Sequence, residues 1–217
     1  MTLDIEQARH AMIEQQVRPW DVLDSRVLEA LGAIPREHFV PEQHRALAFA
    51  DTALPIGHGQ CMFKPVLEGR MLQAVALKAN DEVLEIGTGS GFITACLAHM
   101  ARAVTSIDIH TDFLESAKAK LNTLDLNNVR FEQADALTYQ PQQQFDAVLI
   151  TGAVAVVPEA FKHWLRPGGR LFVIQGLSPV QEALCLTRNG DSFDVESLLE
   201  TDVAYLTGAQ PESKFTL

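Results

Sequence analysis

Basic residues are scarce in this chain. Its 217 residues include 17 lysines and arginines against 28 aspartates and glutamates, which gives a formal net charge of −11 at pH 7. A surface with this excess of carboxylates repels a phosphate backbone, and no segment carries a run of lysine and arginine that would offset the repulsion. We therefore expect no nucleic acid among the partners of the protein.

Long hydrophobic runs are also missing. No apolar stretch approaches the roughly 18 residues that a membrane-spanning helix needs. The first residues, MTLDIEQARH, are acidic and polar, whereas a secretory signal peptide begins with basic residues followed by an apolar segment. The sequence therefore predicts no membrane association and a cytoplasmic location.

Cysteine is rare as well, since the chain has only Cys61, Cys96 and Cys185. These residues lie far apart and form neither a CxxC motif nor an even set, so we expect free thiols and no disulfide framework. The ligand spacings that structural metal sites share are absent too. The sequence thus predicts no metal site.

The remaining composition is typical of a folded globular domain. Apolar residues make up 47% of it and charged residues 21%, which is enough to build a sizeable buried core and excludes global disorder. The length suits one domain, or one domain with a modest extension.

The first part of the chain differs in pattern from the rest. Residues 1 to about 50 repeat apolar side chains at three- and four-residue intervals, which predicts two short helices interrupted by Pro19, Pro35 and Pro41. Residues from about 50 to 65 have neither helical nor strand periodicity, and we expect a long loop of the kind that is often functional. We treat residues 1–65 as an N-terminal extension and residues 66–217 as one compact core.

From residue 66 onward, helices alternate with short apolar strands. The pattern predicts strands at 82–86, 103–109, 129–133, 147–150 and 171–174, with helices near 67–75, 92–100, 112–124 and 158–163. Such alternation needs a parallel sheet with helices on both faces, whereas Asn189-Gly190, between two further strands, is suited to a tight antiparallel hairpin. We therefore predict an α/β fold with a Rossmann-like, doubly wound, mostly parallel sheet and a C-terminal antiparallel strand pair.

The strongest local signal is VLEIGTGSGF at residues 83–92, an apolar strand that runs into Gly87, Gly89 and Gly91 and then a helix. Glycines permit positive φ and a close approach of the backbone to a ligand, and the helix that follows presents unpaired N–H groups. A dinucleotide-binding fingerprint would have glycine at position 92, where this chain has Phe92. We expect a polar ligand other than NAD, with a ligand-free turn as the alternative.

Carboxylates accompany three successive strands. Glu85, two residues before Gly87, would repel a pyrophosphate and favour a cationic ligand. Asp108 ends the next strand, where an acid accepts hydrogen bonds from both ribose hydroxyls, and Asp135 follows the third, where it or the neighbouring backbone could accept one from an adenine amino group. S-adenosylmethionine fits, because its sulfonium and ammonium groups are positive and it has no phosphate. A helix cap for Asp108 and a plain loop acid for Asp135 stay as alternatives.

These residues resemble the class I S-adenosylmethionine-dependent methyltransferases. Three segments, RVL at 26–28, IPREHFVP at 34–41 and LPIGHGQ at 54–60, narrow the resemblance to the protein-L-isoaspartate O-methyltransferase family, over about residues 12–176. Members of that family methylate the abnormal carboxylate of isoaspartyl residues in damaged proteins, the first step of their repair. The resemblance implies S-adenosyl-L-methionine as cofactor, a protein or peptide carboxylate as substrate and a substrate-side loop within residues 1–65.

The resemblance also indicates which residues bind the cofactor. They are Gln60, Cys61, Met62, Glu85, Gly87, Thr88, Gly89, Gly91, Asp108, Ile109, Asp135 and Ala136.

The chain departs from the family pattern at residues 61–63, at residue 136 and at residues 204–206. After Gly-x-Gly-Gln the family usually reads Thr-Ile-Ser, with the serine at the methyl-transfer site, and here Phe63 takes the place of that serine. Ala136 replaces a usual glycine, and Ala204-Tyr205-Leu206 is the best match to a Val-Pro-Leu near the pocket. Because Phe63 has no hydroxyl, two further hypotheses stand beside isoaspartyl methylation: a paralogue with another acceptor, and a cofactor-binding protein without turnover.

Overall fold

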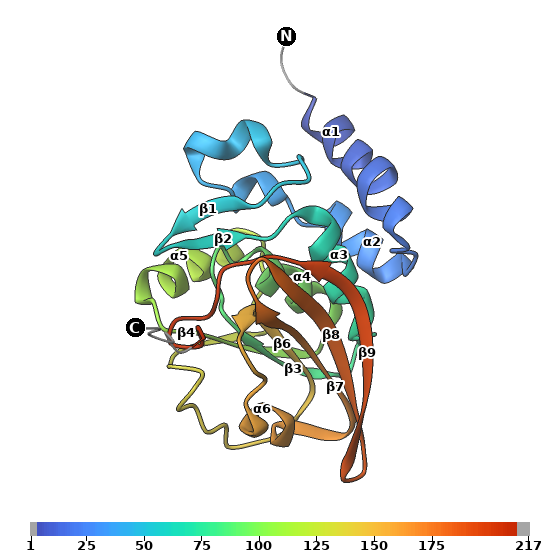
Figure 1. Cartoon of the computed structure of the whole chain (residues 1–217). Helices are drawn as coiled ribbons and strands as arrows, with labels where there is room; N and C mark the ends of the chain where they lie inside the picture. The colour runs from blue at the N-terminus through green and yellow to red at the C-terminus, as the bar shows by residue number, and fades with distance from the viewer. Residues whose placement is uncertain (1–3, 212–217) are drawn as a thin grey trace, which may run out of the picture.

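A seven-stranded sheet forms the centre of the molecule, which Figure 1 shows as a computed structural model describing residues 4–211. The strands of the sheet are β3 (Glu82–Ile86), β4 (Ala103–Asp108), β5 (Val129–Gln133), β6 (Phe145–Val154), β7 (Leu165–Leu177), β8 (Val180–Asn189) and β9 (Ser192–Thr201). The α-helices are α1 (Ile5–Met12), α2 (Ser25–Ala33), α3 (Pro65–Ala74), α4 (Phe92–Met100), α5 (Thr111–Asn122) and α6 (Glu159–His163).

The strand order is β5-β4-β3-β6-β7-β8-β9. Strands β3 to β7 pair in parallel, and β8 and β9 add antiparallel pairings at one edge. This arrangement confirms the predicted fold class. Two strands, β6 and β7, extend beyond their predicted apolar centres, because pairing continues past two register irregularities, at Phe145 with Leu165 and at Val154 with Gln175.

The N-terminal region contains the two predicted short helices. Asp4 caps α1 by accepting a hydrogen bond from the backbone N–H of Gln7, and Asp24 caps α2 through the N–H of Arg26. Three short 3-10 segments and one π-helical turn connect and extend these helices. Among residues 4–211, no helix is both long and apolar enough to cross a bilayer.

The expectation of an irregular loop at residues 50–65 is wrong for its centre. Strands β1 (Leu54–Gly57) and β2 (Gln60–Met62) form a small antiparallel hairpin. Its tight turn is possible because Gly57, His58 and Gly59 all adopt positive φ. Strands of four and three residues are too short to show a period in the sequence.

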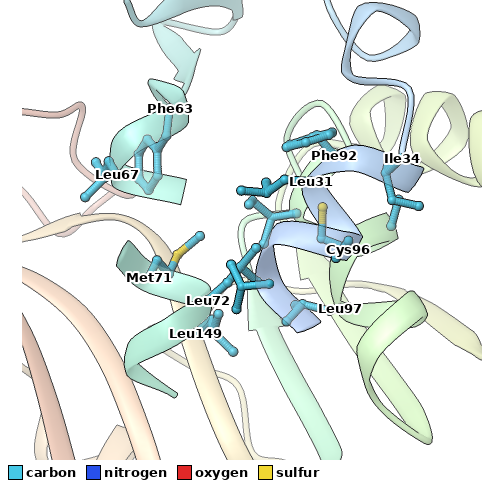
Figure 2. Packing of buried hydrophobic residues seen from close by; sticks show 14 of the residues in the cluster. Leu31, Ile34, Phe63, Leu67, Met71, Leu72, Phe92, Cys96, Leu97 and Leu149 are labelled. Atoms are coloured by element: carbon cyan, nitrogen blue, oxygen red, sulfur yellow. The ribbon is translucent and has the colours of Figure 1, made fainter. Parts of the chain in front are cut away.

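The hydrophobic core has two parts, one on each face of the sheet. Figure 2 shows the first, where Leu31 of α2, Leu72 of α3, Leu97 of α4 and Leu149 of β6 meet. The second lies on the opposite face, where Phe161 of α6 packs with residues of β6 and β7. Because α2 contributes to the first cluster, the N-terminal segment and the sheet share one core.

Candidate active site

A pocket lies at the carboxyl ends of the parallel strands. The chain runs from β3 outward to β5 and then returns to β6 on the other side of β3, and this reversal leaves a crevice where open α/β sheets bind ligands. The pocket encloses about 790 Å³, its open mouth included. Its wall comes from the β3–α4 loop, the end of β4, the loop after β5, the β1–β2 hairpin and residues 206 and 207.

The glycine loop that follows β3 forms the floor of this pocket. Gly87 and Gly89 line it, with φ of 93° and 50°. A Cβ on Gly87 would lie 2.5 Å from Oγ1 of Thr151, whose hydroxyl donates to the carbonyls of Ile86 and Gly87. Glycine is therefore required here by packing as well as by backbone conformation.

Gly91 has a different role from the one predicted. Among the described residues it does not line the pocket, and its N–H donates to the carbonyl of Thr88. A Cβ at Gly91 would come within 2.7 Å of Cβ of Ala117, so this glycine allows α4 to pack against α5. The third glycine of the motif thus maintains the conformation of the loop without lining the pocket.

Asp108 lies on the pocket wall at the end of β4, with 7% of its surface exposed. Its Oδ2 accepts from the N–H of Gly89 at 3.0 Å and its Oδ1 from the N–H of His110 at 2.9 Å. Helix α5 has His110 as its N-cap residue, so the helix-cap alternative for Asp108 is not met. Each carboxylate oxygen still has a lone pair available for a ligand.

The loop after β5 supplies the remaining predicted residues. Asp135 and Ala136 both line the pocket, and Oδ1 of Asp135 accepts from the N–H of Leu137 at 2.9 Å, which fixes the turn. Ile109 lines the pocket from the neighbouring strand end with 38% of its surface exposed. An apolar side chain beside backbone polar groups is suited to the flat face and polar edge of a nucleobase.

The structure corrects the prediction for Glu85. Alternate residues of a strand point to opposite faces, and Glu85 points to the face covered by α4, so it is buried and absent from the described lining of the pocket. Its Oε2 accepts from the hydroxyls of Thr94 at 2.6 Å and Ser106 at 2.5 Å. Burial raises the pKa of Glu85 to about 8, so it is mainly protonated at neutral pH and cannot act as a fixed anion.

Thr88 joins this buried network. The residue lines the pocket but is almost fully buried, and its Oγ1 lies 2.6 Å from Oγ of Ser106. A chain of hydroxyls thus connects the glycine loop to the carboxyl of Glu85. Glu85 is therefore connected to the glycine loop by hydrogen bonds and does not contact the interior of the pocket directly.

The β1–β2 hairpin and the residue after it close one side of the pocket. Gln60, Cys61, Met62 and Phe63 all line it. The side-chain amide of Gln60 donates to the carbonyl of Tyr205 at 3.1 Å, which ties the hairpin to the C-terminal segment. Phe63 is 6% exposed and belongs to the hydrophobic core.

A second pocket adjoins the first across this hairpin. It encloses about 1090 Å³, its open mouth included, and shares Gln60, Cys61, Phe63 and Thr151 with the first pocket. Of the three residues matched to the family's Val-Pro-Leu, Ala204 and Tyr205 line the second pocket, whereas Leu206 lines the first. The hydroxyl of Tyr205 donates to the carbonyl of Gly176 at 2.9 Å.

Glu68 is a pocket residue that sequence reasoning missed. It lies on α3, is fully buried, lines the first pocket and forms an ion pair with Arg36. Burial raises the pKa of Glu68 and the guanidinium of Arg36 opposes that shift. Arg36 also donates to the carbonyl of Phe63 at 2.7 Å and to that of Ala48 at 2.7 Å. A charged residue within an apolar helical stretch was the only signal in the sequence.

Solved structures share this architecture. A Plasmodium falciparum structure described as a beta-aspartate methyltransferase in complex with S-adenosyl-L-homocysteine matches with a TM-score of 0.79 and 15% identity, over 94% of this chain and 99% of that one. A second structure, named protein-L-isoaspartate O-methyltransferase, also gives 0.79, at 24% identity over 94% of this chain and 66% of the other. Likenesses at these identities show the fold, and the class of protein follows from the sequence.

Sequence comparison identifies the class of protein and its family. The sequence profile of the protein-L-isoaspartate(D-aspartate) O-methyltransferase family matches residues 7–212. A protein-L-isoaspartate O-methyltransferase of Myxococcus xanthus is 40% identical over 201 residues, 89% of this chain and 93% of its own. One of Methylorubrum populi is 40% identical over 184 residues, 84% and 86% of the two chains. The chain belongs to the protein-L-isoaspartate O-methyltransferase family. This membership does not favour a different acceptor or a protein without turnover.

Proposed function

We propose that the protein transfers a methyl group from S-adenosyl-L-methionine, bound in the first pocket, to an isoaspartyl carboxylate of a polypeptide that enters the second pocket. Family membership supports the reaction. The observation that carries the spatial assignment is the shared wall: Gln60, Cys61, Phe63 and Thr151 border both pockets, so a donor in one and an acceptor in the other meet at these residues.

The first pocket fits this cofactor in its charge. Among the described residues that line it there is no lysine or arginine, whereas Asp108 and Asp135 are acidic and Glu68 is paired with Arg36. Such a wall attracts a cation and repels a phosphate. We assign the ribose hydroxyls to Asp108, the adenine to Asp135, Ala136 and Ile109, and the amino-acid part to the backbone of the glycine loop. When bound, the cofactor supplies an electrophilic methyl group on a sulfonium.

The acceptor needs little chemical activation from the chain. A carboxyl group with a pKa of about 4 is already ionised at pH 7, so no general base has to remove a proton. The task of the site is to hold the carboxylate in line with the methyl carbon, and such placement contributes on the order of 7–11 kcal/mol to catalysis. Lys64 is the cation among the described residues of the second pocket, and we assign to it the attraction of the carboxylate.

Methyl transfer to paired peptides tests the proposal. One peptide contains an isoaspartyl residue, and its twin contains a normal aspartyl residue in the same sequence. We expect the isoaspartyl peptide alone to acquire a methyl ester that is released at alkaline pH. Equal labelling of the two peptides, or no labelling of either while S-adenosyl-L-methionine still binds, would contradict the assignment of the acceptor.

A further inference from the structure

Three side chains with metal-ligating atoms meet at the rim of the first pocket. His58 lies at the turn of the β1–β2 hairpin, His110 directly precedes α5, and Asp112 lies in the first turn of that helix. Nε2 of His58 is 2.9 and 3.1 Å from the two carboxylate oxygens of Asp112. One ligating atom of each side chain lies within 4.8 Å of the other two. Figure 1 shows the hairpin beside α5, where the two elements face each other.

His110 has an unused ligating atom. Its Nε2 is buried and has no hydrogen-bond partner among the described residues. The ring stacks on that of His58, with centroids 3.9 Å apart and planes at 12°, and it contacts the ring of Phe113 edge to face. A buried polar atom without a partner costs free energy, and a bound ligand removes that cost.

The chemistry of the three donors selects the kind of ion. Two imidazoles and one carboxylate are typical ligands of Zn²⁺ and its neighbours in the first transition row, whereas Ca²⁺ and Mg²⁺ take oxygen ligands almost alone. Bonds of about 2.0–2.2 Å place neighbouring ligands of a tetrahedral ion about 3.3–3.6 Å apart. The His58–Asp112 pair, at 2.9 and 3.1 Å, is slightly closer than this, and a separation of up to 4.8 Å in the cluster has to close by about 1 Å.

One ring has to turn when an ion enters. Lone pairs of ring nitrogens lie in the ring planes, so two nearly parallel imidazoles do not direct them at one point. Both rings contact Phe113 edge to face, but the side chain of His58 is 41% exposed and has room to rotate, whereas Nε2 of His110 is buried. A water molecule can complete the coordination, because the carboxylate of Asp112 is also exposed.

We propose that His58, His110 and Asp112 form a site for a divalent transition-metal ion such as Zn²⁺. The ion would connect the hairpin to α5 across 52 residues of sequence, as counted from His58 to His110. Because His110 and the hairpin both line the first pocket, such a connection fixes two of its walls relative to each other. No short sequence motif predicts the site, because its residues come together only in the folded chain.

Calorimetric titration of the full chain with ZnCl₂ tests this proposal. We expect one equivalent to bind, and His58→Ala and Asp112→Asn each to weaken that binding by about tenfold or more. His99→Ala is the matched control, because His99 is exposed on α4 and outside the cluster. Circular dichroism and thermal unfolding establish that the variants are folded.

A second measurement needs no variant. Cu²⁺ bound to the wild-type chain should give an electron paramagnetic resonance spectrum with splitting from two imidazole nitrogens. No binding of Zn²⁺ by the wild-type chain, equal binding by all variants, or a copper spectrum without nitrogen splitting would overturn the proposal.

Discussion

Phe63 is the side chain that departs furthest from the usual sequence of the family. A serine there would offer a hydroxyl to the acceptor carboxylate, and one hydrogen bond to a charged group contributes about 1.5–3 kcal/mol. We expect Phe63→Ser to raise kcat/KM for an isoaspartyl peptide by about tenfold or more. It should also lower the melting temperature, because a buried phenyl ring is lost from the core. Ester release and thermal unfolding measure the two effects.

The variant Phe63→Ala separates these effects. It leaves a similar cavity at the same boundary and adds no hydroxyl. We expect a comparable loss of stability without a comparable gain in rate. Equal rates for the serine and alanine variants would show that the reaction is limited by the bulk of Phe63 and not by the absence of a hydrogen bond.

Asp108 tests the assignment of the cofactor. Asp108→Asn keeps the shape of the side chain but removes its charge and replaces one of its two acceptor oxygens with a donor. We expect the Kd for S-adenosyl-L-methionine to rise by about 10- to 100-fold in calorimetric titration. Asp191→Asn, in the exposed β8–β9 turn, changes the net charge equally and should leave the Kd unaltered. An unchanged Kd for Asp108→Asn would remove this residue from the cofactor site.

The buried carboxyl of Glu85 makes stability depend on pH. Between its ordinary pKa of 4.5 and its raised pKa of about 8, the unfolded chain has lost this proton and the folded chain keeps it. The contribution of Glu85 to the free energy of unfolding therefore falls with rising pH, by about 1.4 kcal/mol per pH unit. Below this window both states hold the proton and above it both have lost it, so the contribution is constant.

The variant Glu85→Gln has no proton to lose at this position. We expect its stability relative to wild type to increase steadily from about pH 5 to about pH 8, as measured by urea unfolding. Glu196→Gln, on the exposed part of β9, should follow the wild-type profile. Parallel profiles for wild type and Glu85→Gln would contradict the raised pKa.

These residues show what a sequence can and cannot predict about a site. Asp108 and Asp135 were placed at one edge of the sheet because parallel strands end together, and the structure puts both on the pocket wall. Their contact with a cofactor stays a prediction. Glu85 was misplaced because its distance in sequence from the glycines does not show to which face of the sheet it points. Glu68 gave only the weak signal of a charge within an apolar helical stretch, because its partner Arg36 is 32 positions away in sequence.

The packing of α4 on α5 depends on one position without a side chain. Gly91→Ala would combine a positive φ of 86° with a Cβ 2.7 Å from that of Ala117. Gly190→Ala has a similar φ of 65° but nothing within 4 Å of the added Cβ. This variant therefore measures the free-energy cost of the positive φ alone. In urea unfolding we expect Gly190→Ala to cost about 1 kcal/mol and Gly91→Ala about 1–3 kcal/mol more. Equal losses would mean that the two helices adjust freely.

The elements themselves were predicted more completely than the site. Strands β3 and β5 have their predicted bounds. Val83, Leu84 and Ile86 make most of β3 apolar and buried, whereas in the edge strand β5 the apolar Val129 and Phe131 alternate with polar residues. The β1–β2 hairpin was missed because its strands, of four and three residues, are too short to show strand periodicity. The ends of β6 and β7 were missed because pairing there relies on irregular register.

Across the whole molecule, charge should influence the choice between cofactor and product. S-adenosyl-L-methionine has one net positive charge at pH 7, and its demethylated product has none. The chain carries −11, and the first pocket is acidic. Raising NaCl from 0.05 to 0.5 M should weaken binding of the cofactor by about threefold and leave that of the product nearly constant. Titrations at both salt concentrations measure this, and equal salt dependence would argue against an electrostatic preference.

The hairpin that separates the two pockets also limits how the enzyme handles a long substrate. Gln60, Cys61 and Phe63 line both pockets, so with donor and acceptor bound as proposed, a movement of this segment would open both pockets together. We therefore expect both molecules to leave after each turnover. A protein that carries several lesions should consequently be modified in separate encounters, in a distributive manner, with singly esterified chains accumulating before multiply esterified ones.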